Sequence, residues 1–205
     1  MCKYGNIWEF KNELLLLCND LIPYLEETLY GCYLYVDKIY IYRTVNVNDR
    51  ESSYLWHFDN NPSEVVKNII YLNQVTDENS PFEYLTDNNG KGVLGECTRR
   101  GTEYWKDPKN NSRVDNLVND YIARGTHRSN KLTGPMFTGC SFNNNAIHRA
   151  NPIKKGYRDV VNIRVIPADT PPPEYIDKSW TTSFESSGIV NRDPQLSWLI
   201  SPLPS

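Results

Sequence analysis

A histidine and an aspartate separated by a single residue are the strongest indication of chemistry in this sequence. They are His57 and Asp59, in the stretch SSYLWHFDNNP, and the chain holds only three histidines. At the end of a β-strand, residues i and i+2 project to the same side of the sheet. Two histidines and one carboxylate on one face can hold ferrous iron and leave the opposite positions open for oxygen and a cosubstrate. For an isolated pair, an aspartate that only caps a helix or a turn is the alternative.

The third ligand of such a site must come from a strand that is distant in the sequence but adjacent in space. His127 lies in ARGTHRSN, a polar stretch without a strand pattern. His148 lies in NNNAIHRANP, where we expect the end of a strand just before a hairpin. His148 is therefore the expected third ligand.

An arginine further along the chain could bind a cosubstrate at the same site. Arg158 lies ten residues beyond His148, on a strand expected to return antiparallel beside the one that ends at His148. The planar guanidinium of arginine can hold a carboxylate through two hydrogen bonds. We therefore expect Arg158 to face the interior and to neutralise the distal carboxylate of an α-keto acid cosubstrate.

The segments that must position these residues are mostly strands. Residues 32–47 are rich in tyrosine, valine and isoleucine and predict two strands that meet at a turn at Asp37 and Lys38. Residues 64–75 predict a strand covered on both faces, because their β-branched character is continuous. Residues 134–168 predict strand, turn, strand, hairpin and strand.

Helices are expected in two places. Residues 7–30 carry apolar side chains at helical spacing, and Pro23 predicts two short helices or one kinked helix. Residues 86–134 form an irregular insert in which residues 114–122 have helical spacing, with Gly125 as the stop. A long segment of this kind between strands is typical of a lid or a substrate-facing insert.

This order of elements predicts one domain over residues 1–205 of the α+β, mainly β class, built on a β-sandwich or jelly roll. Residues 1–32 form its N-terminal helical segment and residues 33–168 its core. Residues 169–205 are a tail rich in proline and serine, which we expect to wrap the surface or trail in solvent.

The composition bounds the class of protein. Hydrophobic residues make up 39% of the chain and charged residues 23%, which is a globular mixture. The formal net charge of -3 argues against a nucleic-acid partner. No apolar run forms a signal peptide or approaches the roughly 20 residues of a membrane span, so we expect a cytoplasmic protein without a membrane partner. The five cysteines lack a Cys-x-x-Cys motif, and we expect idle or buried thiols.

Three stretches together resemble the phytanoyl-CoA dioxygenase family of iron(II)- and 2-oxoglutarate-dependent oxygenases. They are WHFD at residues 56–59, IIYLNQVTDENSPFEYL at 69–85 and FNNNAIHRANPIKKGYRDVVNIRVIPA at 142–168. The resemblance covers residues 35–168 and rests on the order and spacing of these motifs.

The resemblance implies a double-stranded β-helix core, a cupin-like jelly roll, that binds Fe(II) through His57, Asp59 and His148. Arg158 would bind the C5 carboxylate of 2-oxoglutarate, whose keto acid end chelates the iron. With O2, such enzymes release succinate and CO2 and hydroxylate an unactivated C–H bond of a small-molecule substrate. Related halogenases have glycine in place of the aspartate, so Asp59 favours hydroxylation. Desaturation, ring closure and epimerisation use the same iron site.

Two stretches depart from the family pattern. The usual turn, an acidic residue followed by x-Asn-Gly-Pro, is DENSPFEY here, with Ser80 in place of glycine. The usual Pro-Gly-Ser-His is missing, and TDNNG stands there. The resemblance implies a small-metabolite substrate, since the family's substrates are small metabolites, some of them carrier-bound.

Several further residues have a structural and a functional interpretation. The aromatic and amide side chains near the site either line the pocket or pack in the core, and we favour core packing for Tyr40, Tyr42, Trp56, Tyr71 and Asn73. The insert is locally basic and either attracts an anionic substrate or is a solvated loop, which we favour for Arg99, Arg100, Arg124, His127 and Arg128.

Two other classes of protein are compatible with the metal pattern. A jelly-roll metal-binding module or a zinc-dependent hydrolase could use the same three ligands, but its chemistry has no need of Arg158. A non-catalytic jelly roll used for assembly would need neither a metal nor these side chains.

Overall fold

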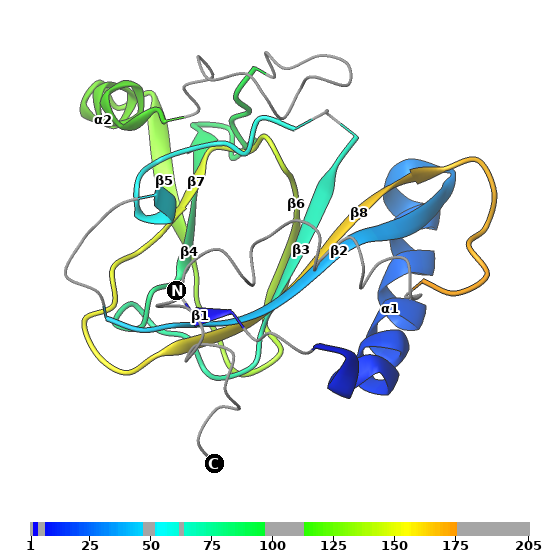
Figure 1. Cartoon of the computed structure of the whole chain (residues 1–205). Coiled ribbons are helices and arrows are strands. Elements are labelled where there is room, and N and C mark those ends of the chain that lie inside the picture. The colour runs from blue at the N-terminus through cyan, green and yellow to red at the C-terminus, as the bar shows by residue number, and fades with distance from the viewer. Residues whose placement is uncertain (1, 4–6, 47–51, 62–63, 97–112, 176–205) are drawn as a thin grey trace. The chain divides into compact units, whose positions relative to one another are not determined.

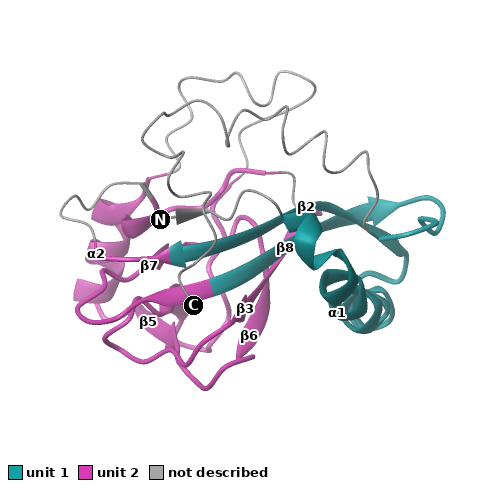
Figure 2. Cartoon of the chain, turned by 60° about the horizontal axis from the view of Figure 1, so that its bottom comes forward, with its two compact units in different colours: residues 1–43, 160–205 teal, residues 44–159 magenta. Residues whose placement is uncertain are grey.

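The computed structural model describes residues 2–3, 7–46, 52–61, 64–96 and 113–175 (Figure 1). The chain divides into two compact units, which Figure 2 draws in different colours. Unit 1 consists of residues 1–43 and 160–205, and unit 2 of residues 44–159. The expectation of one domain with an N-terminal segment, a core and a tail stays a prediction.

The described chain is mainly β, and its strands belong to two antiparallel sheets accompanied by few helices. The predicted α+β, mainly β class is therefore confirmed, and two antiparallel sheets are the components of a jelly-roll core. Within the described ranges, each helix is too short or too polar to cross a membrane.

The N-terminal helix of unit 1 buries one apolar stripe. A 3-10 turn, η1 (Ile7–Phe10), leads into α1 (Lys11–Leu25). Side chains three or four residues apart lie on the same face of a helix. The buried residues of α1 follow that spacing and are Leu14, Cys18, Ile22 and Leu25.

Pro23 lies inside α1 and does not interrupt it, so of the two expected arrangements, two short helices divided at Pro23 is wrong, and a kinked helix stays a prediction. It lies in the last turn of α1, so its missing N–H removes one backbone hydrogen bond close to the helix end. The chain continues as a π-helical turn, η2 (Glu26–Tyr30). Gly31 ends this turn with φ +67°, a conformation that glycine adopts without a steric penalty.

The strands of unit 1 also correct one expectation. β1 (Cys2–Lys3) pairs antiparallel with β2 (Tyr33–Thr44), and β8 (Arg158–Ala168) lies on the other side of β2. The turn predicted at Asp37 is absent, and β2 runs through it as one strand. The guanidinium of Arg164 on β8 forms an ion pair with Asp37, so the charge is neutralised inside the sheet.

Unit 2 holds the other strands. β3 (Val66–Tyr71) pairs antiparallel with β6 (Gly139–Asn143). β4 (Phe82–Asp87) lies between β5 (His127–Leu132) and β7 (His148–Ala150), antiparallel to both. A 3-10 turn, η3 (Ser52–Tyr54), and the predicted helix α2 (Asp115–Ala123) complete the unit, and Gly125 follows α2 with positive φ as expected.

Two strand predictions in unit 2 are wrong. His127 begins a strand rather than lying in an irregular stretch, because the polar residues of β5 line up with β4 at the edge of a sheet. His148 begins β7, which pairs with β4, whereas β8 belongs to the other sheet. No tight hairpin joins β7 to β8. The loop between these strands is instead hydrogen-bonded to the turn before β4, where the Lys154 N–H donates to the Glu78 carbonyl at 2.7 Å.

A small core beneath the His-x-Asp segment fixes α2 to unit 2. Trp56 is 1% exposed and packs with Leu85, Val118 and Ile147. Its backbone N–H donates to the Asp115 carboxylate at 3.0 Å. Trp56 is therefore a core residue, as expected, and it anchors the segment that carries the candidate ligands.

Candidate metal centre

His57 and His148 lie directly opposite each other on antiparallel segments. The His57 N–H donates to the His148 carbonyl at 2.9 Å, and the His148 N–H donates to the His57 carbonyl at 2.8 Å. Two residues that exchange both hydrogen bonds carry their side chains on the same face of the pair. The Asp59 N–H donates to the Asn144 carbonyl at 3.0 Å and extends this pairing. Asp59, two residues from His57, therefore returns to the same face.

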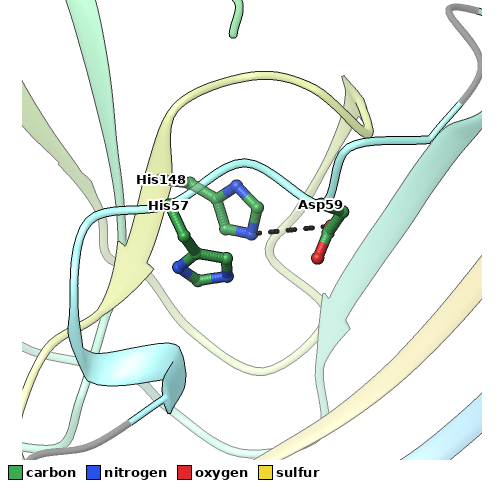
Figure 3. A group of neighbouring side chains, drawn as sticks. All are labelled: His57, Asp59 and His148. Carbon is green, nitrogen blue, oxygen red and sulfur yellow. Dashed lines mark ion pairs between the residues drawn. The ribbon is translucent and has the colours of Figure 1, made fainter. Parts of the chain in front are cut away.

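The three side chains converge on one small volume. One ligand atom from each of His57, Asp59 and His148 lies within 4.8 Å of the others. The two imidazole centroids are 4.4 Å apart, and His148 Nε2 lies 3.9 Å from Asp59 Oδ2. Figure 3 shows the rings and the carboxylate gathered around one point. A divalent cation bound by two imidazoles and one carboxylate fits this donor set.

The hydrogen bonds of the two imidazoles prepare them as ligands. His57 Nδ1–H donates to the Leu55 carbonyl at 2.7 Å, and His148 Nδ1–H donates to the Ala146 carbonyl at 2.7 Å. A carbonyl can only accept, so the proton of each ring is on Nδ1. The lone pair of each Nε2 is then free for a metal.

Burial keeps both rings neutral. The two histidines are each 7% exposed. Burial, helped by the neighbouring His148, lowers the pKa of His57 to about 3. Burial also lowers the pKa of His148. Neutral imidazole is the form that binds a metal, so the site is ready for one at neutral pH.

A lysine provides the counter-charge of Asp59. Lys67 on β3 places Nζ 2.5 Å from Asp59 Oδ2, the same oxygen that faces His148. Burial raises the pKa of Asp59, but the Lys67 ammonium outweighs it and lowers the pKa below its ordinary value. Asp59 is therefore ionised, and any metal there must share or displace the lysine ammonium.

One asparagine holds the end of the ligand segment. Asn145 is buried, and its carboxamide bonds both backbone groups of Asn61, accepting from N–H at 2.9 Å and donating to the carbonyl at 2.7 Å. Asn61 lies two residues beyond Asp59. These two hydrogen bonds fix the segment that carries His57 and Asp59 against the segment that leads to His148.

Aromatic side chains cover one side of the centre. Phe82 on β4 and Phe142 on β6 lie with ring centroids 5.3 Å and 5.1 Å from that of His148. Phe142 is opposite Lys67 in the β3–β6 register, so both side chains are on one face. The centre therefore combines an apolar wall with the ammonium of Lys67.

Arg158 lies at the start of β8. It reaches its position without the expected hairpin, because β8 and the strand of His148 belong to different sheets. The residue is 4% exposed. Its Nη1 donates to the Ser80 carbonyl at 2.5 Å, and its Nη2 lies 3.4 Å from Thr44 Oγ1. Its Nε is buried without a partner among the described residues. A buried guanidinium with an open donor and no carboxylate beside it fits an anionic ligand.

Asn73 holds Arg158 in this position. The Asn73 amide donates to the Tyr157 carbonyl at 3.1 Å, and its oxygen accepts from the Asp159 N–H at 2.7 Å. The two bonds thus clamp the backbone on either side of Arg158. A pocket-lining role was the alternative for Asn73, and these contacts show a structural one.

The remaining candidates lie elsewhere. Tyr71 is fully buried, and its hydroxyl bonds the Leu132 carbonyl and the Phe82 N–H, as expected of a core residue. His127 is not part of the three-residue cluster and stacks on Tyr121 with 4.2 Å between ring centroids.

The residues expected to make the insert basic are only partly described. Arg124 pairs with Asp120 on α2, and Arg128 is exposed on β5. Arg99 and Arg100 lie outside the described residues.

Sequence reasoning missed Lys67 and Asn145. Lys67 has a signal in the sequence, because it is the one charged residue within the apolar strand VVKNIIY. Asn145 belongs to the run NNN, and nothing in the sequence separates it from its neighbours. Only the fold shows which asparagine makes the bonds to Asn61.

The comparison with curated proteins finds one relative of known activity. The chain is 30% identical over 103 residues to an L-proline trans-4-hydroxylase from Streptomyces griseoviridis. The match spans 47% of this chain and 38% of that enzyme, which is well under half of its length. No protein-family model matches the chain.

Solved structures show distant similarity. They include the iron-bound EctD from S. alaskensis (14% identity, TM-score 0.47, 74% of this chain and 52% of that one). The α-ketoglutarate-dependent epimerase SnoN from nogalamycin biosynthesis has 12% identity and a TM-score of 0.48, over 77% of this chain and 59% of that one. HygX from Streptomyces hygroscopicus, bound to nickel, 2-oxoglutarate and hygromycin B, has 14% identity and a TM-score of 0.45, over 78% and 66%. All three TM-scores are below 0.5.

Proposed function

We propose that this chain is a non-haem Fe(II)- and 2-oxoglutarate-dependent dioxygenase that hydroxylates an unactivated C–H bond of a small molecule, with release of succinate and CO2. The observation that carries the proposal is the cluster of His57, Asp59 and His148, with both Nε2 lone pairs free and all three ligand atoms within 4.8 Å of one another. Partial similarity to a proline hydroxylase supports the same reaction class.

The chain's own residues have separate roles in this proposal. His57, Asp59 and His148 would hold Fe(II) through one nitrogen or oxygen atom each. Bound iron supplies the redox chemistry that couples decarboxylation of the keto acid to oxidation of the substrate. The carbonyls of Leu55 and Ala146 orient the two imidazoles through Nδ1.

Arg158 is the proposed cosubstrate residue. Its buried guanidinium has an open Nε donor and no acidic partner among the described residues, which supports the binding of the C5 carboxylate of 2-oxoglutarate. This role is specific to a diacid cosubstrate, and it separates the oxygenase from a zinc hydrolase with the same ligands.

The primary substrate belongs to the same proposal. We infer a small metabolite, and the name of the curated relative makes L-proline the first compound to test, followed by other free amino acids. Anionic and carrier-bound acids come next, because Lys67 brings a cation to the metal centre.

The test uses anaerobically purified protein loaded with Fe(II) and supplied with 2-oxoglutarate, O2 and a panel of amino acids. We expect succinate to form, and His57→Ala, Asp59→Ala and His148→Ala each to abolish it. Arg158→Ala is expected to raise the 2-oxoglutarate requirement sharply and to leave Fe(II) affinity within about twofold, because Arg158 contacts no metal ligand.

Two outcomes would contradict the proposal. Full succinate formation by a ligand variant would remove that residue from the iron site. Tight zinc binding without a visible charge-transfer band on addition of Fe(II) and 2-oxoglutarate would favour the hydrolase or binding-module alternative.

A further inference from the structure

We propose that the hydroxyl of Ser80 is a second donor of the anion subsite at Arg158 and binds the same distal carboxylate of the cosubstrate. This inference rests on the proposed function, because it adds a residue to the 2-oxoglutarate pocket. It also explains a departure of the sequence, since Ser80 stands where the family that the chain resembles has glycine.

The backbone at Ser80 is strained for a serine. Its φ is +67°, the left-handed region in which a side chain costs roughly 1–2 kcal/mol and which glycine adopts freely. Pro81 follows directly, and a residue before proline is further restricted. A serine at this position thus carries a local cost that glycine would not, and residues held in such conformations cluster at ligand sites.

The hydroxyl of Ser80 forms no hydrogen bond with the described residues that would offset this cost. Ser80 is 0% exposed, and its hydroxyl has no hydrogen-bond partner among the described residues. A buried hydroxyl without a partner costs free energy, so such a group calls for a ligand that satisfies it.

The residue with the unpaired hydroxyl also accepts a hydrogen bond from Arg158, whose Nε is unpaired as well. Arg158 Nη1 donates to the carbonyl of Ser80, and covalent geometry keeps a serine hydroxyl within a few ångströms of its own carbonyl oxygen. Arg158 Nε is the second buried donor without a partner. Two open donors on adjacent groups match the two oxygens of one carboxylate.

Thr44 completes this subsite as a fixed support. Its hydroxyl is 3.4 Å from Arg158 Nη2, and the residue is 2% exposed. With Nη1 on the Ser80 carbonyl and Nη2 on Thr44, the guanidinium plane is held and Nε is its open donor. The subsite is therefore specific for an anion at Nε and at the Ser80 hydroxyl.

The experiment compares two keto acids on the Ni(II)-loaded protein by isothermal titration calorimetry. 2-Oxoglutarate carries the distal carboxylate, and pyruvate has the same chelating end without it. Ser80→Gly and Ser80→Ala both remove the hydroxyl, whereas only the glycine relieves the backbone. We expect both variants to bind 2-oxoglutarate about tenfold more weakly, the scale of one hydrogen bond to a charged group, and to bind pyruvate unchanged.

Thermal unfolding of the metal-free variants tests whether Ser80 has a structural role instead. If it had one, the Ser80 variants would unfold at a lower temperature than the unsubstituted chain. Ser80→Gly is expected to unfold at a midpoint no lower than the unsubstituted chain, because the strain at positive φ disappears. Ser129→Ala, which removes a hydroxyl bonded to Glu83 in the same unit, is the matched control and should not change either affinity.

The outcomes separate this inference from the proposed function. If both Ser80 variants keep 2-oxoglutarate affinity within twofold while Arg158→Ala loses it, Ser80 is no ligand and the oxygenase proposal stands. If Arg158→Ala also keeps it and 2-oxoglutarate binds no better than pyruvate, the cosubstrate role of Arg158 fails and this inference fails with it. Loss of pyruvate affinity in the Ser80 variants would show a general distortion and overturn the assignment.

Discussion

At the scale of single residues, the candidate centre pairs one carboxylate, that of Asp59, with the ammonium of Lys67. Asp59 faces two imidazoles that burial keeps neutral, and Lys67 pairs with the oxygen that faces His148. The Lys67 ammonium and a bound metal would therefore compete for the same oxygen of Asp59. This arrangement keeps a buried carboxylate charged in the absence of a metal, at the expense of metal affinity.

Removal of that lysine should strengthen metal binding. For Lys67→Met we expect Co(II) to bind at least tenfold more tightly, because a unit charge about 4 Å from a divalent ion opposes its binding by about 2 kcal/mol even at the dielectric constant of bulk water. Co(II) absorption titrations measure the change.

Two variants control this experiment. Lys67→Arg keeps the charge and should bind Co(II) as the unsubstituted chain does. Lys131→Met breaks an exposed pair with Asp77 and should have no effect. Weaker Co(II) binding by Lys67→Met would show instead that the lysine orients Asp59 as a ligand.

The buried histidines make the metal-free protein sensitive to acid. His57 has a folded pKa of about 3 against an ordinary value of 6.5, so between these values the unfolded chain binds a proton that the folded chain does not. The free energy of unfolding should therefore fall as the pH drops from about 6.5 towards 3. Urea unfolding at several pH values measures it, and His57→Gln should flatten the slope. An equal slope in that variant would assign the effect to other groups.

At the scale of elements, the site depends on how distant segments are fastened together. The segment that carries His57 and Asp59 is bonded to His148 and Asn144 on one side, and its end is clamped by Asn145. On the other side Trp56 is tied to α2 through Asp115. The ligands are thus positioned by the backbone hydrogen bonds of neighbouring segments.

Loss of the Asn145 clamp should weaken both stability and metal binding. Asn145→Ala leaves two buried backbone groups of Asn61 without partners, and we expect a loss of about 2–4 kcal/mol in the free energy of unfolding. Urea unfolding and Co(II) titration of the same samples measure the two effects. Asn88→Ala, which removes an exposed bond to the Gly125 carbonyl, is the control and should change stability by less than about 0.5 kcal/mol. Unchanged metal affinity in a destabilised Asn145→Ala would show that the clamp does not position the ligands.

At the scale of the whole molecule, the candidate site belongs to one of the two units. His57, Asp59, Lys67, His148 and Arg158 all lie within residues 44–159. The ligands come from segments separated by about ninety residues of chain, and their meeting depends on the fold of this unit. Metal binding and folding of the unit are therefore linked.

A bound metal should stabilise the protein by mass action. At a free Co(II) concentration 100 times the dissociation constant, we expect about 2.7 kcal/mol of stabilisation, which raises the thermal midpoint by roughly 5–10 °C. Thermal unfolding with and without Co(II) measures this shift, and a chelator should reverse it. Asp59→Ala should show no shift, and an equal shift in that variant would place the metal elsewhere.

The sequence by itself determined the features that local geometry controls. The period of two residues along an extended segment puts His57 and Asp59 on one face, although the structure forms an isolated bridge there and not the expected strand end. The long β-branched segments predict a mainly β chain. The helix at residues 115–123 followed from the spacing of its apolar residues. Each of these depends on neighbours a few residues away, so the pattern alone contains the information.

Only the tertiary structure decided which distant segments lie together. In the structure β7 pairs with β4 and not with β8. β2 continues through Asp37, because Arg164 neutralises that charge. Lys67 lies against Asp59. The structure also leaves Ser80 and Arg158 with buried donors that lack partners. Such contacts depend on how strands far apart in the chain pack and pair. That arrangement is set by the free energy of the whole fold, which local residue patterns do not encode.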